Sequence, residues 1–333
     1  MDDWYSELLH LTNSMREGQK QEVNGVDMVM AGGILRNPSV TSVSQKQTEK
    51  VFGYKWKKRD TFEGGLPARM RSWLIDKYGD VPNSQYFKDY GDKVVVLDAG
   101  CGAALSALAL FEPALRRMRY IGVDISEAVD VAKQRFEELG AQALFVQSDL
   151  QNIPLPEKSV DVIFSEGVLH HTDDTRQAFK SLLPYLKSSG RIVFYIYRRK
   201  GPIREFTDDY IREQLQQMSP DEAWTAIEPL TKLGIALGEM DVEIDVPTNI
   251  DVLNIPAGKI NLQRLFYWHV FKAMYRTDLS FEEMQHINFD WYAPKNAHRH
   301  TIEEVRNWCD EFGLVIEKEC VEMAGISVIA RKV

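Results

Sequence analysis

Residues 94–102, Val-Val-Val-Leu-Asp-Ala-Gly-Cys-Gly, decide how this chain folds. Four apolar residues, three of them β-branched, precede an acid and two glycines, which predicts a buried β-strand that ends in a tight loop at 98–102. The alanine- and leucine-rich run at 103–110 has high helix propensity, so a helix should follow at once. Glycines allow a ligand to approach the backbone, and a helix N-terminus offers free N–H groups. The stretch therefore predicts a nucleotide-type binding site.

The residues around this loop indicate which kind of nucleotide it suits. A dinucleotide fingerprint needs a third glycine or an alanine three residues after Gly102, where this chain has Leu105. Asp98 within the turn would repel a phosphate and favours a cationic group. The next predicted strand ends in Asp124, at the spacing of an acid that accepts hydrogen bonds from ribose hydroxyls. A pyrophosphate ligand is thus disfavoured.

The alternation of strands and helices continues along the chain. Strands are predicted at 120–124, 143–147, 160–164, 191–197, 314–318 and 326–330, and helices at 126–140, 172–187 and 301–313. A short polar link with two prolines, 151–159, joins the third strand to the fourth, and 203–300 has helical periodicity. In an open parallel sheet the carboxyl ends of the strands share one crevice, where ligands bind.

The chain resembles the class I S-adenosylmethionine-dependent methyltransferases, and in particular bacterial small-molecule enzymes with an N-terminal lid and a C-terminal helical insertion. The matching motifs occur in order at 96–102, 122–126, 148–150, 165–174 and 186–193, with Ser189 where the family often has glycine. The resemblance implies an α/β fold with a doubly wound, Rossmann-like, seven-stranded and mostly parallel sheet, and a helical cap inserted after the fifth strand.

The resemblance also implies a division of the chain. Residues 1–85 would form an N-terminal extension or lid, 86–200 the cofactor-binding core, 201–300 a helical insertion that caps the substrate, and 301–333 the end of the core sheet. Within the first part, Phe52, Tyr54 and Trp56 either line a lid over the cofactor or form a hydrophobic plug on the sheet. Arg69 and Arg71 either meet the cofactor carboxylate or face solvent.

S-adenosylmethionine is the cofactor that the resemblance implies, with S-adenosylhomocysteine as product. Asp98, Gly100 and Gly102 would face its methionine end, Asp124 its ribose, Asp149 its adenine, and 165–167 the sulfonium. The predicted cofactor-binding residues are Asp98, Ala99, Gly100, Cys101, Gly102, Asp124, Ile125, Ser148, Asp149, Leu150, Ser165, Glu166 and Gly167.

Methyl transfer is an in-line displacement, so the protein mainly aligns the reactants, and a base matters only if the acceptor carries a proton. His171 and His170 follow the fourth strand and are the candidate bases, or else they pack within the loop. The candidate substrate-binding residues are Arg198, Arg199, Trp291, Tyr292, His298 and His300. The alternatives for these are a solvated loop and the core of the cap. No metal site is predicted, because the His-x-His pair lacks further ligands.

Composition limits the partners of the protein. The net charge of −9 argues against nucleic acid, because phosphate binding needs a basic face. Three widely spaced cysteines suit a reducing compartment, the N-terminus does not resemble a signal peptide, and no apolar run has the length of a membrane span. We therefore expect a cytoplasmic protein, monomeric or homodimeric, with a small-molecule partner and no membrane partner.

The sequence thus predicts methyl transfer to an oxygen or nitrogen, less readily to a carbon or sulfur, of a small biosynthetic compound. The competing hypotheses are an NAD-dependent dehydrogenase and a non-catalytic binding module with the same fold. Methylation of protein or RNA is disfavoured, because the fourth strand lacks an Asn/Asp-Pro-Pro-Tyr motif and no basic surface is predicted.

Overall fold

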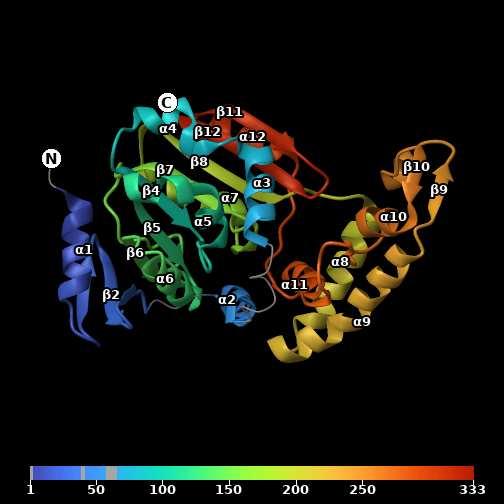
Figure 1. Ribbon diagram of the computed structural model, residues 1–333, viewed down its shortest axis with the longest axis horizontal. Coiled ribbons are helices and arrows are strands. Elements are labelled where there is room, and N and C mark those ends of the chain that lie inside the picture. Colours follow the sequence, from blue (N-terminus) through green and yellow to red (C-terminus); the bar gives the residue numbers. More distant parts are fainter. Residues whose placement is uncertain (1–2, 39–41, 58–65) are drawn as a thin grey trace.

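A ten-stranded mixed sheet forms the centre of the molecule (Figure 1). The structure, a computed structural model, describes residues 3–38, 42–57 and 66–333. The strands lie in the order β1-β2-β3-β6-β5-β4-β7-β8-β12-β11; neighbours from β3 to β8 are parallel and the others antiparallel. Their bounds are β1 Lys20–Val23, β2 Val26–Ala31, β3 Ile34–Arg36, β4 Val94–Ala99, β5 Met118–Asp124, β6 Ala143–Gln147, β7 Val160–Glu166, β8 Leu186–Tyr197, β11 Leu314–Val321 and β12 Gly325–Lys332.

The sheet exceeds the seven strands predicted, because the N-terminal segment adds β1, β2 and β3. Two tight turns that sequence reasoning did not use as hairpin signals connect them. Asn24-Gly25 and Gly32-Gly33 all have positive φ, from 47° to 79°, as the two central residues of a type I′ hairpin turn require. β3 then pairs in parallel with β6, with Leu35 opposite Val146. The N-terminal segment is therefore part of the sheet.

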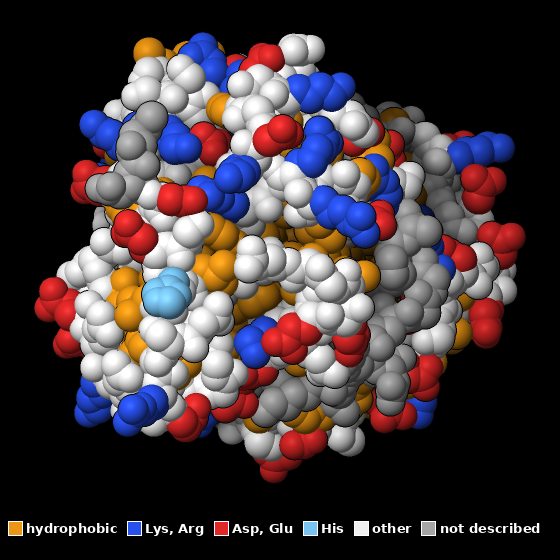
Figure 2. Space-filling model, turned by 60° about the vertical axis from the view of Figure 1, so that its left-hand side comes forward, with side chains coloured by type: hydrophobic (Ala, Val, Ile, Leu, Met, Phe, Trp, Pro, Cys, Tyr) orange, Lys and Arg blue, Asp and Glu red, His pale blue; other side chains and the backbone are white. Residues whose placement is uncertain are grey.

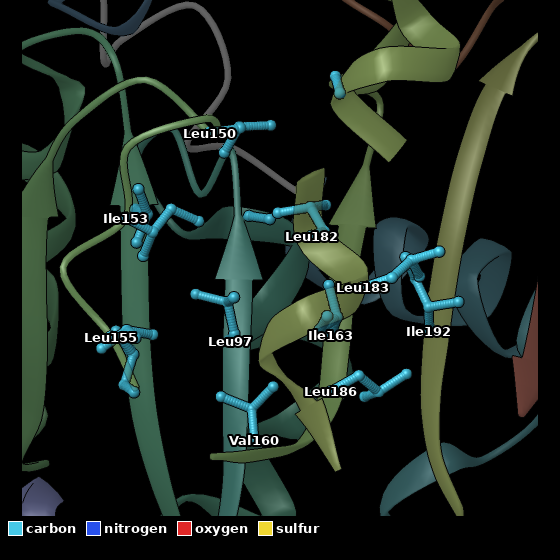
Figure 3. Packing of buried hydrophobic residues seen from close by; sticks show 14 of the residues in the cluster. Leu97, Leu150, Ile153, Leu155, Val160, Ile163, Leu182, Leu183, Leu186 and Ile192 are labelled. Carbon is cyan, nitrogen blue, oxygen red and sulfur yellow. The ribbon is translucent and has the colours of Figure 1, made fainter. Parts of the chain in front are cut away.

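The residues of β4 alternate between the two faces of the sheet, as a strand demands. Val95 and Leu97 belong to one buried apolar cluster, and Val94 and Val96 belong to the other. Both faces are covered, which explains why the strand is apolar throughout rather than alternating. Figure 3 shows part of the first cluster, in which labelled side chains from β4, β7 and β8 lie beside those of α7.

Helices cover both faces of the sheet. One face packs against α1 (Trp4–Ser14), α7 (Thr175–Leu182) and α12 (Ile302–Glu311), and the other against α3 (Leu66–Tyr78), α4 (Gln85–Asp89), α5 (Leu105–Phe111) and α6 (Ala128–Glu138). Short 3-10 helices lie at Val81–Asn83, Glu112–Arg117, Leu169–His171, Leu183–Tyr185 and Asp251–Leu253. The helix α2 (Val43–Lys57) contacts α6 as well as two helices that follow β8.

The helix predicted at 172–187 is shorter than expected. It begins after Asp174, whose side chain accepts a hydrogen bond from the N–H of Gln177 at 2.9 Å, and it ends at Leu182. Pro184 has no N–H to continue the ladder, so the chain turns and enters β8 at Leu186. The predicted strand at 191–197 is therefore only the second half of β8.

An insertion separates β8 from α12 and contains α8 (Pro202–Leu215), α9 (Pro220–Glu239), α10 (Leu262–His269) and α11 (Phe281–Tyr292). It is not wholly helical as predicted, because β9 (Glu243–Val246) and β10 (Gly258–Asn261) form a separate two-stranded sheet. The helices pack closely at Gly238, where a Cβ would lie 2.0 Å from the ring of Tyr275. Figure 1 shows the insertion as a group of elements beside the main sheet, with α2 between it and α6.

The surface is mixed in charge. Figure 2 shows one face, on which acidic and basic side chains both occur and hydrophobic side chains lie in a hollow near the centre of the view. Among the described residues, no helix has the length and apolar character needed to cross a membrane.

Candidate functional site

A cavity of about 810 Å³ lies at the carboxyl ends of β4, β5, β6 and β7. Residues of α2 and α3 form one wall, and residues from the insertion, mainly in α10 and α11, form the opposite wall. The predicted cofactor residues and the insertion therefore border the same space. This is the arrangement expected when ligands bind at the carboxyl edge of a parallel sheet.

The glycine loop after β4 has no room for side chains. Gly100 has a φ of +85°, and a Cβ there would lie 2.1 Å from Cγ1 of Val168. Gly102 has a φ of +49°, and a Cβ there would lie 2.9 Å from Nε1 of Trp56 on α2. Only glycine fits both the backbone and the space. Trp56, one of the aromatic residues predicted for a lid, thus lies directly on this loop.

The amides of the loop are already used within the protein. The N–H groups of Gly100 and Cys101 both donate to the carbonyl of Val123, at 2.7 and 2.9 Å. The N–H of Gly102 donates to Oδ2 of Asp124 at 2.8 Å. A phosphate cradle needs backbone donors that point at the ligand. These three donors point elsewhere, which disfavours a pyrophosphate at the loop.

Two carboxylates border the cavity beside the loop. Asp98 is buried and accepts a hydrogen bond from the hydroxyl of Tyr120 at 2.5 Å; burial raises its pKa to about 7, although that hydrogen bond opposes the shift. Asp124 accepts from Gly102 and, at 2.8 and 2.7 Å, from the N–H and hydroxyl of Ser126. Burial also raises the pKa of Asp124, against these donors. Such carboxylates suit a cationic or hydroxyl-bearing ligand.

The other predicted cofactor residues fall into two groups. Those that line the cavity are Cys101, Ile125, Ser148, Asp149, Leu150, Glu166 and Gly167. Ala99 and Ser165 lie behind it, where the Ser165 hydroxyl donates to the Ala99 carbonyl at 2.9 Å and ties β7 to β4. Their place is in the support of the site rather than on its surface.

Glu166 is held by two groups from α3. Its Oε1 lies 2.6 Å from Nζ of Lys77, and its Oε2 accepts from the hydroxyl of Tyr78. Burial lowers the pKa of Lys77, although the charge of Glu166 opposes this. The Lys77 ammonium also lies 3.1 Å from the ring centroid of Trp73. Glu166 therefore has a structural partner, which fixes the tip of β7.

His171 lines the cavity and has one fixed hydrogen bond. Its Nδ1 lies 2.6 Å from the carbonyl oxygen of Asn296. A carbonyl can only accept, so Nδ1 carries the proton and Nε2 has the lone pair. Burial lowers the pKa of His171 to about 4, although the charge of Asp290 opposes this shift. The imidazole is therefore neutral at pH 7.

His170, in contrast, is fully buried away from the cavity. Its ring lies 3.7 Å from that of Tyr197, centroid to centroid, and burial holds its pKa well below the usual value. Neither ring nitrogen has a hydrogen-bond partner among the described residues. This is the packing role left open by the sequence.

The predicted substrate residues do not line the cavity. Arg198 and His300 form an isolated parallel bridge, Arg199 is exposed, and the N–H of His298 donates to the carbonyl of His170 at 2.9 Å. They belong to a neck, defined here as 198–200 and 298–300, where the chain enters and leaves the insertion. Trp291 and Tyr292 are core residues of the insertion and donate hydrogen bonds to the buried Asp208 at 2.8 and 2.9 Å.

Of the two arginines considered for the cofactor carboxylate, Arg69 lines the cavity and Arg71 does not. Arg69 pairs with Glu283 at 2.8 Å, and Arg71 donates to the carbonyls of Ala109 and Leu110. Both guanidinium groups are therefore engaged within the protein.

Several cavity residues were missed. Two of them lie at the carboxyl end of β8 and the others lie opposite the strand tips; they include Tyr195 and Tyr197 of β8, and Lys55, Arg264, Tyr267, Lys272, His286 and Asp290. Lys55 forms an ion pair with Asp290. Burial raises the pKa of Asp290, but the charges of Lys55, His171 and Lys272 and the hydrogen bond from Lys55 together hold it below its usual value. The sequence could have placed Lys55 at the cavity, because it lies in the segment predicted as a lid. It could not have placed the insertion residues there, because helical periodicity does not tell which buried face adjoins a ligand.

Known proteins resemble the central part of the chain. Residues 97–194 match the family described as "Methyltransferase domain". The chain is 34% identical over 118 residues to an uncharacterized methyltransferase of Bacillus subtilis, covering 35% of this chain and 45% of that protein. It is 28% identical over 162 residues to the malonyl-[acyl-carrier protein] O-methyltransferase of Serratia marcescens, covering 48% of this chain and 58% of that protein.

Among solved structures, the 1,6-didemethyltoxoflavin-N1-methyltransferase of Burkholderia thailandensis, with bound S-adenosylhomocysteine, aligns with a TM-score of 0.45 and 12% identity, over 96% of this chain and 97% of that one. The family match and the curated relatives show that residues 97–194 contain a methyltransferase domain, in agreement with the predicted class of S-adenosylmethionine-dependent methyltransferases. S-adenosylmethionine is the cofactor of this class.

Proposed function

We propose that this protein transfers a methyl group from S-adenosylmethionine to an oxygen or nitrogen of a small molecule bound between the strand tips and the insertion. The observation that supports this most is that one cavity borders Asp98 and Asp124 at one end and residues of the insertion at the other. A cavity of about 810 Å³ lies within the usual range of small-molecule sites.

The residues at the strand tips fit this cofactor. Asp98 would face the cationic ammonium of its methionine part, and Asp124 would accept from the ribose hydroxyls. Asp149 and Leu150 would border the adenine. Trp56, which lies against Gly102, would cover the methionine part from α2. In this proposal 1–85 includes the lid and 201–300 is the substrate cap, with β1–β3 of the same N-terminal part incorporated into the sheet.

When bound, S-adenosylmethionine supplies an electrophilic methyl group on a sulfonium sulfur. The protein aligns the acceptor with it and keeps water out, which is the main requirement of an in-line displacement. Nε2 of His171 accepts the proton that an oxygen or nitrogen nucleophile releases. The nearby charge of Asp290 favours the imidazolium that forms. His170 supports this ring by packing beside it, at 4.3 Å between ring centroids.

The competing hypotheses each have a structural argument against them. A dehydrogenase would place a pyrophosphate at the glycine loop, where the amides of Gly100, Cys101 and Gly102 are already bonded within the protein. A non-catalytic module has no need of a neutral histidine that borders the same cavity as the acids at the strand tips. The comparisons also favour a methyltransferase.

Calorimetric titration with S-adenosylmethionine, S-adenosylhomocysteine and NADH tests the proposal. We expect micromolar binding of the two sulfur ligands and none of NADH. Asp124→Ala should weaken that binding by about 1–3 kcal/mol, because a buried acceptor for the ribose is lost. Asp92→Ala, an exposed acid in the turn before β4, is the matched control and should bind as the wild type does.

Binding of NADH but not of the sulfur ligands would favour the dehydrogenase hypothesis over the proposed function. Equal weakening in both variants would instead show that Asp124 has no special part in cofactor binding.

A further inference from the structure

We propose that the methyl acceptor carries a carboxylate, which Lys272 binds at the insertion end of the cavity. This inference rests on the proposed function and narrows it to acidic acceptors. The support for it is the distribution of charge within the cavity. Basic side chains gather at the insertion end, although the protein as a whole has a net negative charge.

The two ends of the cavity differ in sign. The strand tips and the loops after them contribute the acids Asp98, Asp124, Asp149, Glu166 and Asp173, and the β11–β12 turn contributes Glu322, whereas the insertion contributes one acid, Asp290. The walls formed by α2, α3 and the insertion contribute five cations, Lys55, Arg69, Arg264, Lys272 and Arg276. A protein with a net charge of −9 has thus concentrated basic side chains at one end of a buried site. Such an arrangement raises the local concentration of anions there.

Three of these cations already have carboxylate partners. Lys55 pairs with Asp290, Arg69 with Glu283 at 2.8 Å, and Arg276 with Asp278 at 2.9 Å. Lys272 and Arg264 pair with no carboxylate among the residues that the structure describes. The guanidinium of Arg264 donates to the carbonyl of Tyr275 instead. Lys272 and Arg264 are therefore the side chains at this end with which an anionic ligand could pair.

Lys272 is the more deeply placed of the two. Its side chain is buried, borders the cavity, and has its Nζ 4.6 Å from the ring centroid of Trp291. The same ring has Lys200, Arg204 and Arg212 within 5.4 Å of its centroid. Arg204 is paired with Asp208 and Arg212 with Asp209, which leaves Lys200 and Lys272 without a carboxylate partner among the described residues. A cluster with this excess of cations is costly to bury unless an anion joins it.

The cost of burial is reflected in the pKa of Lys272. Burial lowers the pKa of Lys272 to about 7. The charges of Arg204 and Arg212 act in the same direction, and those of Asp290 and Asp208 oppose the shift. Burial also lowers the pKa of Lys200, which lies beside the same cluster. A bound carboxylate would favour the charged form and raise the pKa of Lys272 again. Binding of such an acceptor is therefore linked to uptake of a proton.

The walls around Lys272 suit an apolar or aromatic body. Tyr195, Tyr197, Tyr267 and Trp268 border the cavity at this end. Benzoate is a simple probe with both features, and benzamide is its neutral match. Both are titrated into the protein that is saturated with S-adenosylhomocysteine, in two buffers of different ionisation enthalpy, so that proton uptake is measured directly.

We expect benzoate to bind at millimolar concentration at pH 6, at least several-fold more tightly than benzamide. Its affinity should fall roughly tenfold between pH 6 and pH 8, as free Lys272 loses its proton, while that of benzamide stays constant. At pH 8 benzoate binding should take up close to one proton. Lys272→Met should abolish the preference for benzoate, and Lys259→Met, at an exposed site on β10, should leave it unchanged.

Lys272→Arg provides a sharper variant, because a guanidinium stays charged. It should keep the preference for benzoate and lose the dependence on pH. Equal binding of benzoate and benzamide by the wild type, absence of benzoate binding, or benzoate binding without proton uptake at pH 8 would each overturn the proposal. These readings on the wild type decide even if a variant fails to fold. Failure of S-adenosylhomocysteine to bind would instead contradict the proposed function.

Discussion

The imidazole of His171 has one tautomer available to it. The hydrogen bond from Nδ1 to the carbonyl of Asn296 fixes the proton on Nδ1 and leaves the lone pair on Nε2. Asn296 is itself held, since its side-chain amide donates to Asp173 at 2.8 Å and its N–H to the hydroxyl of Thr48 at 3.4 Å. The imidazole of His171 is thus oriented by α2 and by the last part of the insertion.

Nitrogen-15 NMR of the imidazoles checks this assignment without any knowledge of the acceptor. His171, identified by loss of its signal in His171→Gln, should show a protonated Nδ1 and remain neutral down to about pH 4. With an oxygen or nitrogen acceptor, the same variant should lower kcat by a factor of roughly 10²–10⁴, the usual contribution of a general base. A His171 signal with the proton on Nε2 would contradict the proposed role.

Residue-level prediction succeeded where a motif fixes the backbone. The loop at 98–102 and the acid at Asp124 could be placed because a strand, a glycine turn and a fixed spacing leave few geometries. Lys272 and Asp290 could not, because their positions depend on how the insertion packs against the sheet. His298 and His300 were expected at the site from their place in the sequence, and the structure puts them in the neck instead.

At the scale of elements, α2 connects the two halves of the site. Trp56 touches the glycine loop, Thr48 supports the Asn296 segment, and Lys55 pairs with Asp290 of the insertion. One helix from the N-terminal part therefore reaches both the strand-tip end and the insertion end of the cavity. The two readings of its aromatic residues, lid and plug, differ in whether cofactor binding depends on them.

Trp56→Ala separates these readings. It removes the ring that lies against Gly102, so we expect the Kd for S-adenosylhomocysteine to rise about tenfold or more, which corresponds to a loss of about 1.4 kcal/mol or more. Lys46→Ala, an exposed site on the same helix, is the control. Hydrogen exchange should also show that the cofactor product protects the amides of α2. A Trp56 variant with unchanged affinity but lower stability would instead support the plug.

Elements were predicted well where both faces of a strand are buried and poorly where local turns decide. The central strands read as apolar runs, and each is present. The strands β1–β3 and the pair β9–β10 were missed, because strands of three to six residues carry little periodicity. The β1–β3 hairpins are identified mainly by their turns.

At the scale of the whole molecule, buried histidines couple stability to pH. Burial lowers the pKa of His286 to about 3 and that of His171 to about 4. In the unfolded chain these side chains bind a proton near pH 6.5, so between about 6.5 and 4 the unfolded state holds more protons and the folded state loses stability as pH falls. Asp98, with a pKa raised to about 7, acts in the opposite direction. Asp124, whose pKa burial also raises, acts in the same direction as Asp98. His170 and His300 have lowered pKa values as well, so we expect the histidines together to outweigh the two carboxyl groups.

Urea unfolding at several pH values between 4.5 and 6.5 measures this. We expect the free energy of unfolding to fall by a few kcal/mol across the range, since each unit of lowered pKa is worth about 1.4 kcal/mol. His286→Gln should reduce the slope. A constant or rising stability on acidification would show that these histidines are protonated in the folded protein.

The neck at 198–200 and 298–300 has a consequence for how such a protein can change over evolutionary time. His300 donates its N–H to the carbonyl of Tyr197 and accepts from the N–H of Arg199, both at 2.9 Å, so the two ends of the insertion are bonded to each other before either reaches the core. Recombination at the two ends of the neck would replace one insertion by another and leave β8 and β12 paired. Under the proposed function, the cofactor site of the sheet and the acceptor specificity of the insertion would then be inherited separately.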